Sequence, residues 1–244
     1  MLDPSQVRAF AERGFVVVPQ VVPQELLATA SRTIDQLLGH QPPPREVRGP
    51  HFYFLEVATA PTLLALLTQS PALALAESLT GTGTLEIPQQ VQVALTFPPF
   101  DHRPGGHHLD GASPPEPDGR PGTFTLLAGV LLSDQPGDDM GNLWVWPGTH
   151  LSHQAFFREH GPDALVACGG YPPIPLPTPE QVRGRAGDLL LAHYLLGHNI
   201  GGNTSDTVRR AVYFRIKRVG HAARWHQFLQ DAWLDYDEVR RMLA

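Results

Sequence analysis

A histidine and an aspartate stand two positions apart at His108 and Asp110, and another histidine, His198, lies much further along the chain. Side chains two positions apart on an extended strand point to the same side, so His108 and Asp110 can both face one ion. A histidine from a distant strand then completes one face of an octahedral metal site. The opposite face stays open, as in the 2-His-1-carboxylate sites of non-haem Fe(II) oxygenases. The sequence therefore predicts a metal site at His108, Asp110 and His198.

Two histidines compete for the distal position, His193 and His198, and both follow the apolar segment 189–192. A histidine at the end of a buried strand needs a hydrogen bond or a metal ion. On one continuous strand these two would face opposite sides, so we expect only one of them to bind the ion. We prefer His198 because a strand that begins near Arg209 follows it. We set His107 aside because it faces away from His108.

The segment 208–216 predicts a strand that carries arginines on both faces. Arg209, Tyr213 and Arg215 share one face, and Arg210 lies on the other. A guanidinium inside an apolar barrel needs an anion, because an unpaired buried charge is costly. A dicarboxylic cosubstrate would supply one through paired hydrogen bonds to Arg209. If Arg209 faces inward, Arg215 does too and can pair with an acidic group of the substrate. The alternative is an edge strand with solvated arginines.

The elements that must position these residues form two groups. Helices are predicted at 3–14, 23–38, 61–79 (one or two) and 223–243, with a short strand at 15–18. Short β-rich runs follow at 85–97, 123–132, 142–146, 186–194 and 208–217. The chain has 23 glycines and 25 prolines, which favours many short elements over a helical bundle.

We therefore predict one domain over 1–244 that is mainly β with flanking helices, built on a double-stranded β-helix (a cupin-like jelly roll). Residues 1–80 form a mostly helical buttress, 85–218 the jelly-roll core and 222–244 a C-terminal helix.

Composition excludes several classes of partner. The formal charge is −6 and Lys217 is the one lysine, so nucleic-acid binding is not expected. No apolar run is long enough for a membrane span, and no basic segment followed by an apolar core marks the N-terminus. The single cysteine, Cys168, leaves no internal disulfide and favours a reducing compartment. We expect a cytoplasmic protein that acts on a small molecule.

Three separated motifs resemble the phytanoyl-CoA dioxygenase family of Fe(II)- and 2-oxoglutarate-dependent oxygenases. The family's HxD motif matches His108 and Asp110, and its Pro-Gly-Ser/Thr-His turn matches 147–150. Its distal histidine and the arginine after it match His198 and Arg209. The likeness begins at the segment 14–19 and covers most of the chain.

This resemblance implies that His108, Asp110 and His198 bind Fe(II) and that Arg209 binds the distal carboxylate of 2-oxoglutarate. It implies a dioxygenase that uses O2 to hydroxylate a small molecule, with release of succinate and CO2. Asp110 favours hydroxylation over halogenation, because related halogenases have a small residue there. Desaturation, epoxidation and ring closure are alternatives that use the same ligands. Gln92 and Thr96, on the strand before the HxD motif, are further candidates for contacts to the cosubstrate.

The chain also departs from the family pattern. Gly129 stands where the human-type enzymes have a tryptophan, so part of the cosubstrate pocket must be built differently. The scarcity of lysine argues against a CoA thioester, whose phosphates favour a cationic surface. His150 is expected to close the turn at Pro147 and Gly148. The loop 112–120 is either a lid or a solvated surface loop.

Two other functions use the same residues. One is a non-oxygenase, cupin-like protein that binds Zn or Ni through the same three ligands, with no cosubstrate for Arg209. The other is a binding module in which the histidine cluster is incidental.

Overall fold

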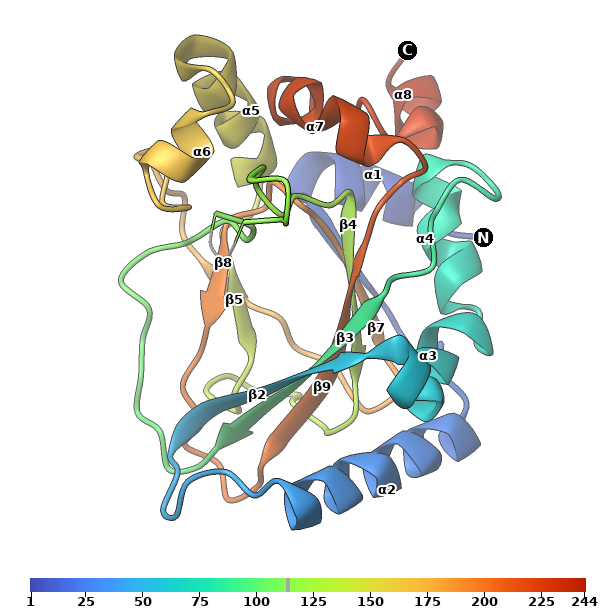
Figure 1. Ribbon diagram of the computed structural model, residues 1–244, viewed down its shortest axis with the longest axis vertical. Coiled ribbons are helices and arrows are strands. Elements are labelled where there is room, and N and C mark those ends of the chain that lie inside the picture. Colours follow the sequence, from blue (N-terminus) through green and yellow to red (C-terminus); the bar gives the residue numbers. More distant parts are fainter. Residues whose placement is uncertain (113–114) are drawn as a thin grey trace.

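The computed structural model describes residues 1–112 and 115–244. Two antiparallel sheets face each other across the molecule (Figure 1). The larger sheet has six strands in the order β1-β7-β4-β9-β3-β2: β1 (Phe15–Val18), β7 (Leu189–His193), β4 (Leu126–Leu131), β9 (Arg209–Ile216), β3 (Gln90–Phe97) and β2 (Gly49–Glu56). The smaller sheet has the order β6-β5-β8: β6 (Glu180–Gln181), β5 (Leu143–Val145) and β8 (His198–Ile200). This architecture confirms the predicted mainly β jelly roll with flanking helices.

Helices lie along the outer side of the larger sheet and at one end of the two sheets (Figure 1). They are α1 (Pro4–Arg13), α2 (Gln24–His40), α3 (Pro61–Thr68), α4 (Ala72–Thr80), α5 (Thr149–His160), α6 (Ala164–Ala167), α7 (His221–Gln230) and α8 (Asp237–Leu243), with a 3-10 turn at Val57–Thr59. The start of α1 shows why the sequence predicts it: the Asp3 carboxylate accepts the backbone N–H groups of Ser5 and Gln6. Gly14 then ends the helix with φ 81°.

No single helix in the described ranges has the length and apolar character needed to cross a membrane. Only α3 and α4 taken together reach that length, and they meet at a 54° bend. Their apolar side chains, including Leu63, Leu66 and Leu79, are fully buried in the protein core.

Two elements have no strong sequence signal. In β2, Phe52 and Phe54 are exposed while Tyr53 is buried, so the apolar residues do not alternate with polar ones as in a half-buried strand. Helix α5 begins after Gly148 without a side-chain cap, which removes the usual start signal. As a result, the sequence did not predict β2. Residues 1–80 therefore contribute two strands, β1 and β2, to the large sheet in addition to their helices.

The single C-terminal helix predicted over 222–244 is wrong. The chain forms α7 and α8 with a break between them, where the Asp231 carboxylate accepts the backbone N–H of Trp233. The buried Tyr236 at this break donates its hydroxyl hydrogen to the carbonyl of Thr125. The apolar spacing is helical on both sides, so the pattern alone could not reveal the break.

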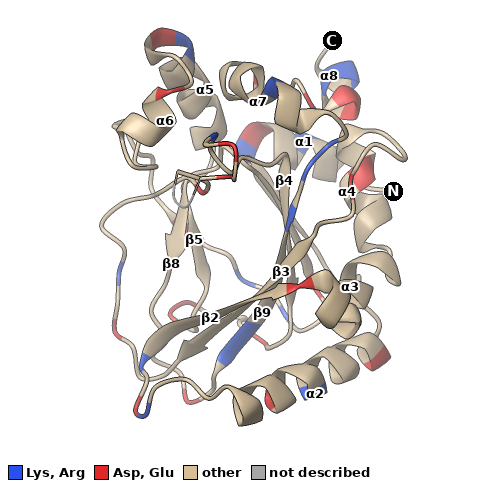
Figure 2. Cartoon of the chain, in the orientation of Figure 1, with Lys and Arg blue, Asp and Glu red and all other residues tan. Residues whose placement is uncertain are grey.

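The register of three adjacent strands decides which side chains face the smaller sheet. Thr96 of β3 lies opposite Arg209 of β9, and Gln92 lies opposite Tyr213. Figure 2 shows basic residues on β9, whereas most other charged residues lie on helices and loops. The alternate side chains of β9, among them Val212 and Phe214, are fully buried in the core on the other face.

Gly129 of β4 makes room for an aromatic ring. It lies opposite Tyr213, and a Cβ atom at position 129 would lie 2.5 Å from the ring carbon Cε1. Real Cβ contacts are never this short, so the ring of Tyr213 takes the volume that a larger residue on β4 would fill. The pocket wall that the sequence places on β4 is therefore built from β9.

We expect Gly129→Ala to lower the free energy of unfolding by about 1–3 kcal/mol, because the added methyl group must displace the Tyr213 ring. The matched control is Gly39→Ala in α2, where nothing lies within 4 Å of the added Cβ. That change should raise stability by up to about 1 kcal/mol through helix propensity. Urea denaturation followed by circular dichroism measures both. Equal stability of Gly129→Ala and the parent would contradict the close contact.

Candidate active site

Three side chains converge between the two sheets at the predicted metal site. One ligand atom from each of His108, Asp110 and His198 lies within 4.8 Å of the others. The Oδ1 atom of Asp110 is 3.4 Å from Nε2 of His108 and 3.7 Å from Nε2 of His198. This donor set has two imidazole nitrogens and one carboxylate oxygen. It fits one face of a divalent transition metal whose other positions stay open.

The backbone brings the two histidines together. The N–H of His108 donates to the carbonyl of His198 at 3.0 Å, and the reverse bond is 3.3 Å. The two imidazole rings then lie with their centroids 4.5 Å apart. The next backbone contact involves Asp110, whose carbonyl accepts the hydroxyl of Tyr194 at 2.8 Å. The metal-facing side chains therefore rest on main-chain contacts between segments that are distant in sequence.

Hydrogen bonds on their far sides orient two of the three side chains. Nδ1 of His198 lies 3.0 Å from the carbonyl of Leu196, which fixes a proton on Nδ1 and leaves Nε2 as the nitrogen that faces Asp110. The other carboxylate oxygen of Asp110, Oδ2, accepts from Nε and from a terminal nitrogen of Arg215 at 2.9 and 2.8 Å. Asp110 is thereby held with Oδ1 toward both histidines.

The charges around Asp110 favour its ionised form. Burial raises the pKa of Asp110, but hydrogen bonding with His108 and His198 and the charge of Arg215 outweigh it and hold the pKa well below its ordinary value. Burial lowers the pKa of His198, and the Asp110 carboxylate more than reverses this, so the net pKa of His198 is raised. A divalent cation bound here would therefore displace a proton.

Arg209 lies on the same face of β9 and is buried, with 5% of its surface exposed. Its Nε donates to the amide oxygen of Gln135 at 3.2 Å, and a terminal nitrogen donates to the hydroxyl of Tyr213 at 2.5 Å. Both acceptors are neutral, and within residues 1–112 and 115–244 no carboxylate lies within ion-pair distance of this guanidinium. A buried cation whose partners are all neutral is suited to bind an anion.

Gln92 and Thr96 line the same cavity as the three metal-facing side chains and Arg209. The amide oxygen of Gln92 accepts from Arg215 at 2.8 Å, so Gln92 supports the arginine that holds Asp110. Thr96 lies opposite Arg209 across the strand pair. Sequence reasoning missed Gln135, a fully buried glutamine from the loop after β4, and nothing in its local sequence distinguishes it.

Arg215 was expected to pair with an acidic group on the substrate. In the structure its acidic partner is Asp110, within the protein. Of the loop 112–120, residues 113 and 114 lie outside the described residues. In the described part, Glu116 forms an ion pair with Lys217 at 2.7 Å, which ties this segment to the end of β9.

The remaining buried histidines have structural contacts. Nε2 of His193 lies 2.8 Å from the carbonyl of Ala232, and its Nδ1 accepts the backbone N–H of Leu195. Nε2 of His107 lies 2.8 Å from Nε2 of His153. Neither His193 nor His107 belongs to the metal-facing cluster, as the sequence predicts.

His150 does not close the turn at Pro147 and Gly148. Its Nε2 lies 3.1 Å from the carbonyl of Ala11 in α1. The turn is instead held by Thr149, whose hydroxyl donates to the carbonyl of Trp146 at 2.6 Å and accepts the backbone N–H of Gly197 at 2.9 Å. A hydroxyl can both donate and accept, which lets Thr149 join the turn to the segment before His198.

A jelly roll with a His-Asp-His cluster defines the class of metal-dependent oxygenases and related cupin-like proteins. Solved structures share the fold. HygX from Streptomyces hygroscopicus, crystallised with nickel and 2-oxoglutarate, superposes with a TM-score of 0.62 at 18% identity, covering 90% of this chain and 88% of that chain. The non-heme alpha-ketoglutarate-dependent epimerase SnoN from nogalamycin biosynthesis has a TM-score of 0.57 at 25% identity, with coverage of 94% and 90%.

The carbocyclase SnoK, also from nogalamycin biosynthesis, has a TM-score of 0.56 at 22% identity, with coverage of 91% and 90%. No curated protein sequence gives a significant match. A sequence profile of the phytanoyl-CoA dioxygenase (PhyH) family matches residues 10–211, so the chain belongs to that family. Family membership makes the protein an oxygenase that depends on iron and 2-oxoglutarate.

Two buried histidines should make the protein less stable in weak acid. Burial lowers the pKa of His150 to about 4 and that of His153 to about 3. These histidines take up protons near pH 6.5 in the unfolded chain but not in the folded protein. Their contribution to the free energy of unfolding is therefore complete above pH 6.5 and falls as the pH drops toward the pKa values of the folded protein. Each histidine should remove about 1.4 kcal/mol between pH 7.5 and 5.5.

The measurement is urea denaturation at both pH values in EDTA, which removes any contribution from metal binding. His150→Gln keeps a donor for the Ala11 carbonyl and lacks the titrating group. We expect the loss of stability in this variant to be smaller than in the parent by about 1.4 kcal/mol. The same loss in both proteins would contradict a depressed pKa at His150.

Proposed function

We propose that the protein hydroxylates a small-molecule substrate and that His108, Asp110 and His198 hold its iron. Iron and 2-oxoglutarate supply the oxidation by O2, with succinate and CO2 as the products of the cosubstrate. The protein supplies binding, orientation and exclusion of water. Related solved structures support a small-molecule substrate, because HygX was crystallised with hygromycin B and SnoN with nogalamycin RO. The carboxylate ligand Asp110 favours hydroxylation over halogenation. The reactions of SnoN and SnoK differ from hydroxylation, and ring closure uses the same ligand set.

Each residue has a distinct part in this proposal. His198 presents Nε2 because its Nδ1 is occupied by the Leu196 carbonyl. Asp110 presents Oδ1 because Arg215 holds Oδ2. Gln92 keeps Arg215 in place, and a direct contact from Gln92 or Thr96 to the cosubstrate stays a prediction.

The observation that carries the proposal is the buried Arg209 in the same cavity as the three candidate ligands. A metal-binding protein without a cosubstrate gains nothing from an anion-binding arginine at this place. A distal carboxylate of 2-oxoglutarate supplies the missing anion and leaves the keto acid end free to reach the metal. This complementarity favours the oxygenase over the two alternative functions.

The first test measures turnover of 2-oxoglutarate. Protein treated with chelator is loaded with Fe(II) without oxygen, mixed with 2-oxoglutarate and aerated, and succinate is quantified by chromatography. The parent should form succinate even without its substrate. Asp110→Ala should lose this activity and bind Fe(II) or Mn(II) at least about 100-fold more weakly, because loss of a supporting residue alone costs 10- to 100-fold.

The control for this test is His226→Ala, which removes an exposed histidine on α7 and should match the parent. No succinate from the parent, with tight metal binding retained, would favour the non-oxygenase metal protein. Metal affinity that is unchanged in a His108→Ala, Asp110→Ala double variant would favour a binding module with an incidental cluster.

Arg209 is tested by cosubstrate binding. Arg209→Leu should weaken the binding of 2-oxoglutarate and of its mimic N-oxalylglycine by about 10- to 150-fold, the value of a charge-assisted hydrogen bond, with metal affinity kept. Arg209→Lys keeps the charge without the planar fork and should show an intermediate loss. Calorimetric titration of the Mn(II)-loaded protein measures both.

The matched control is Arg210→Leu, the neighbouring arginine on the opposite face of β9. Arg210 forms an ion pair with Asp35 on α2 at 2.7 Å and does not line the cavity. Its loss should leave N-oxalylglycine affinity unchanged. Equal affinity of parent and Arg209→Leu would reject the anion-binding role.

A further inference from the structure

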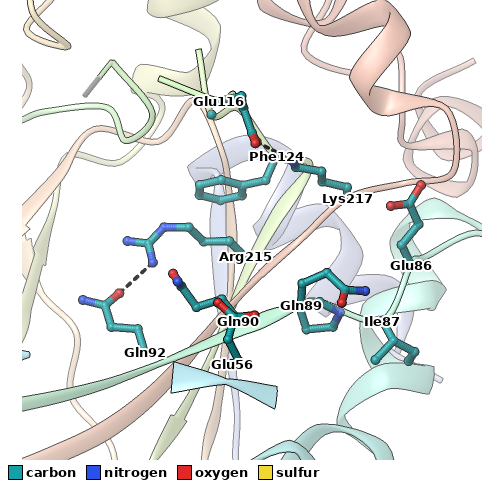
Figure 3. A pocket seen from close by; sticks show the side chains of 12 residues that line it. Glu56, Glu86, Ile87, Gln89, Gln90, Gln92, Glu116, Phe124, Arg215 and Lys217 are labelled. Atoms are coloured by element: carbon teal, nitrogen blue, oxygen red, sulfur yellow. Dashed lines mark hydrogen bonds and ion pairs between the residues drawn. The ribbon is translucent and has the colours of Figure 1, made fainter. Parts of the chain in front are cut away.

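A second cavity, of about 400 Å³, adjoins the candidate metal site. Arg215 and Gln92 line both cavities and so form the wall between them. Figure 3 shows Arg215 reaching toward Gln92 on one side of the cavity, with Phe124 above it. Cavities of this size hold small organic ligands, and this one ends at the residues that orient Asp110.

The two cationic groups of this outer cavity are already neutralised. Arg215 pairs with Asp110 at 2.8 Å. Lys217 pairs with Glu116 at 2.7 Å, as Figure 3 shows. An anionic ligand would therefore have to break an existing ion pair. This argues against a carboxylate, a phosphate or a CoA ester as the group bound here.

Two carboxylates of the outer cavity face solvent and have no protein partner in the described chain. Glu56, at the end of β2, and Glu86, in the segment before β3, both line it, and in the described chain neither side chain has a hydrogen bond or an ion pair. Gln89 and Gln90, both exposed, line the same cavity (Figure 3). Amide groups both donate and accept hydrogen bonds, as hydroxylated ligands require. Ile87 and Phe124 add an apolar surface.

We propose that the outer cavity binds the substrate and that the substrate is a hydroxylated small molecule with a protonated amine. The amine lies near Glu56 and Glu86, and the carbon to be oxidised extends past Arg215 and Gln92 toward the metal. That the bound molecule is a substrate rests on the proposed oxygenase function. That it carries an amine rests on the cavity and its charges. It also gives a use to the acidic groups beside the candidate active site. The chain has a single lysine, so lysines are scarce as partners for these groups.

The test uses three sugars of one shape and different charge: glucosamine, N-acetylglucosamine and glucuronate. Their binding to the full-length protein, loaded with Zn(II) and 2-oxoglutarate without oxygen, is followed by saturation-transfer NMR. Glucosamine should bind most tightly and glucuronate most weakly, and the preference should weaken with added salt. Equal binding of the three sugars, or no binding of glucosamine, overturns the proposal.

Variants locate the binding. A Glu56→Gln, Glu86→Gln double variant should bind glucosamine about 2- to 30-fold more weakly, as expected for two partly solvated ion pairs, and N-acetylglucosamine unchanged. The matched control is Glu25→Gln with Glu159→Gln, which removes two exposed carboxylates outside the cavity. Equal loss in both double variants shows a general charge effect and overturns the proposal.

A last measurement places the binding near the metal. With Mn(II) in place of Zn(II), the protons of bound glucosamine should relax faster than with Zn(II), because the outer cavity adjoins the metal site.

The turnover test then separates this proposal from the proposed function. Charge-selective binding without succinate formation in the turnover test would leave the amine site standing and reject the oxygenase. Succinate formation with no charge selectivity would do the reverse.

Discussion

The candidate active site depends on the backbone pairing of His108 with His198. Two main-chain hydrogen bonds join these residues, which belong to segments far apart in sequence. His108 forms an isolated bridge and Asp110, two positions on, lies in a turn within reach of both imidazoles. The Tyr194 hydroxyl holds the Asp110 carbonyl, and Arg215 determines which carboxylate oxygen faces the histidines. Loss of this pairing would disperse all three donors at once.

Strand β9 shows how one element handles charge on two faces. Arg210, on the outer face, has a surface partner in Asp35. Arg215, on the inner face, has Asp110, and Arg209 has only neutral partners. Because the described chain places no carboxylate at Arg209, its charge is balanced only by neutral hydrogen-bond acceptors, which is the basis for proposing an external anion there. Arg215, in contrast, has its anionic partner within the protein.

Much of this arrangement follows from local sequence rules. Strand alternation separates Arg209 from Arg210 on β9. It also predicts His108 beside Asp110, although the chain there forms an isolated bridge followed by a turn. The expectation that only one of His193 and His198 binds the ion assumed one continuous strand, whereas the chain ends β7 at His193 and begins β8 at His198. His193 is kept out of the site by contacts with the C-terminal segment near Ala232, and local sequence carries no sign of such a contact.

The rest depends on register between strands, which local sequence does not determine. Gln92 supports Arg215, and Tyr213 occupies the space above Gly129, only because β3, β9 and β4 pair in one register. A slip of one residue in β9 would turn Arg209 and Arg215 into the apolar core and Val212 and Phe214 into the cavity. The cost of burying those two charges without anions is large, so the charges themselves help to select the register that builds the site.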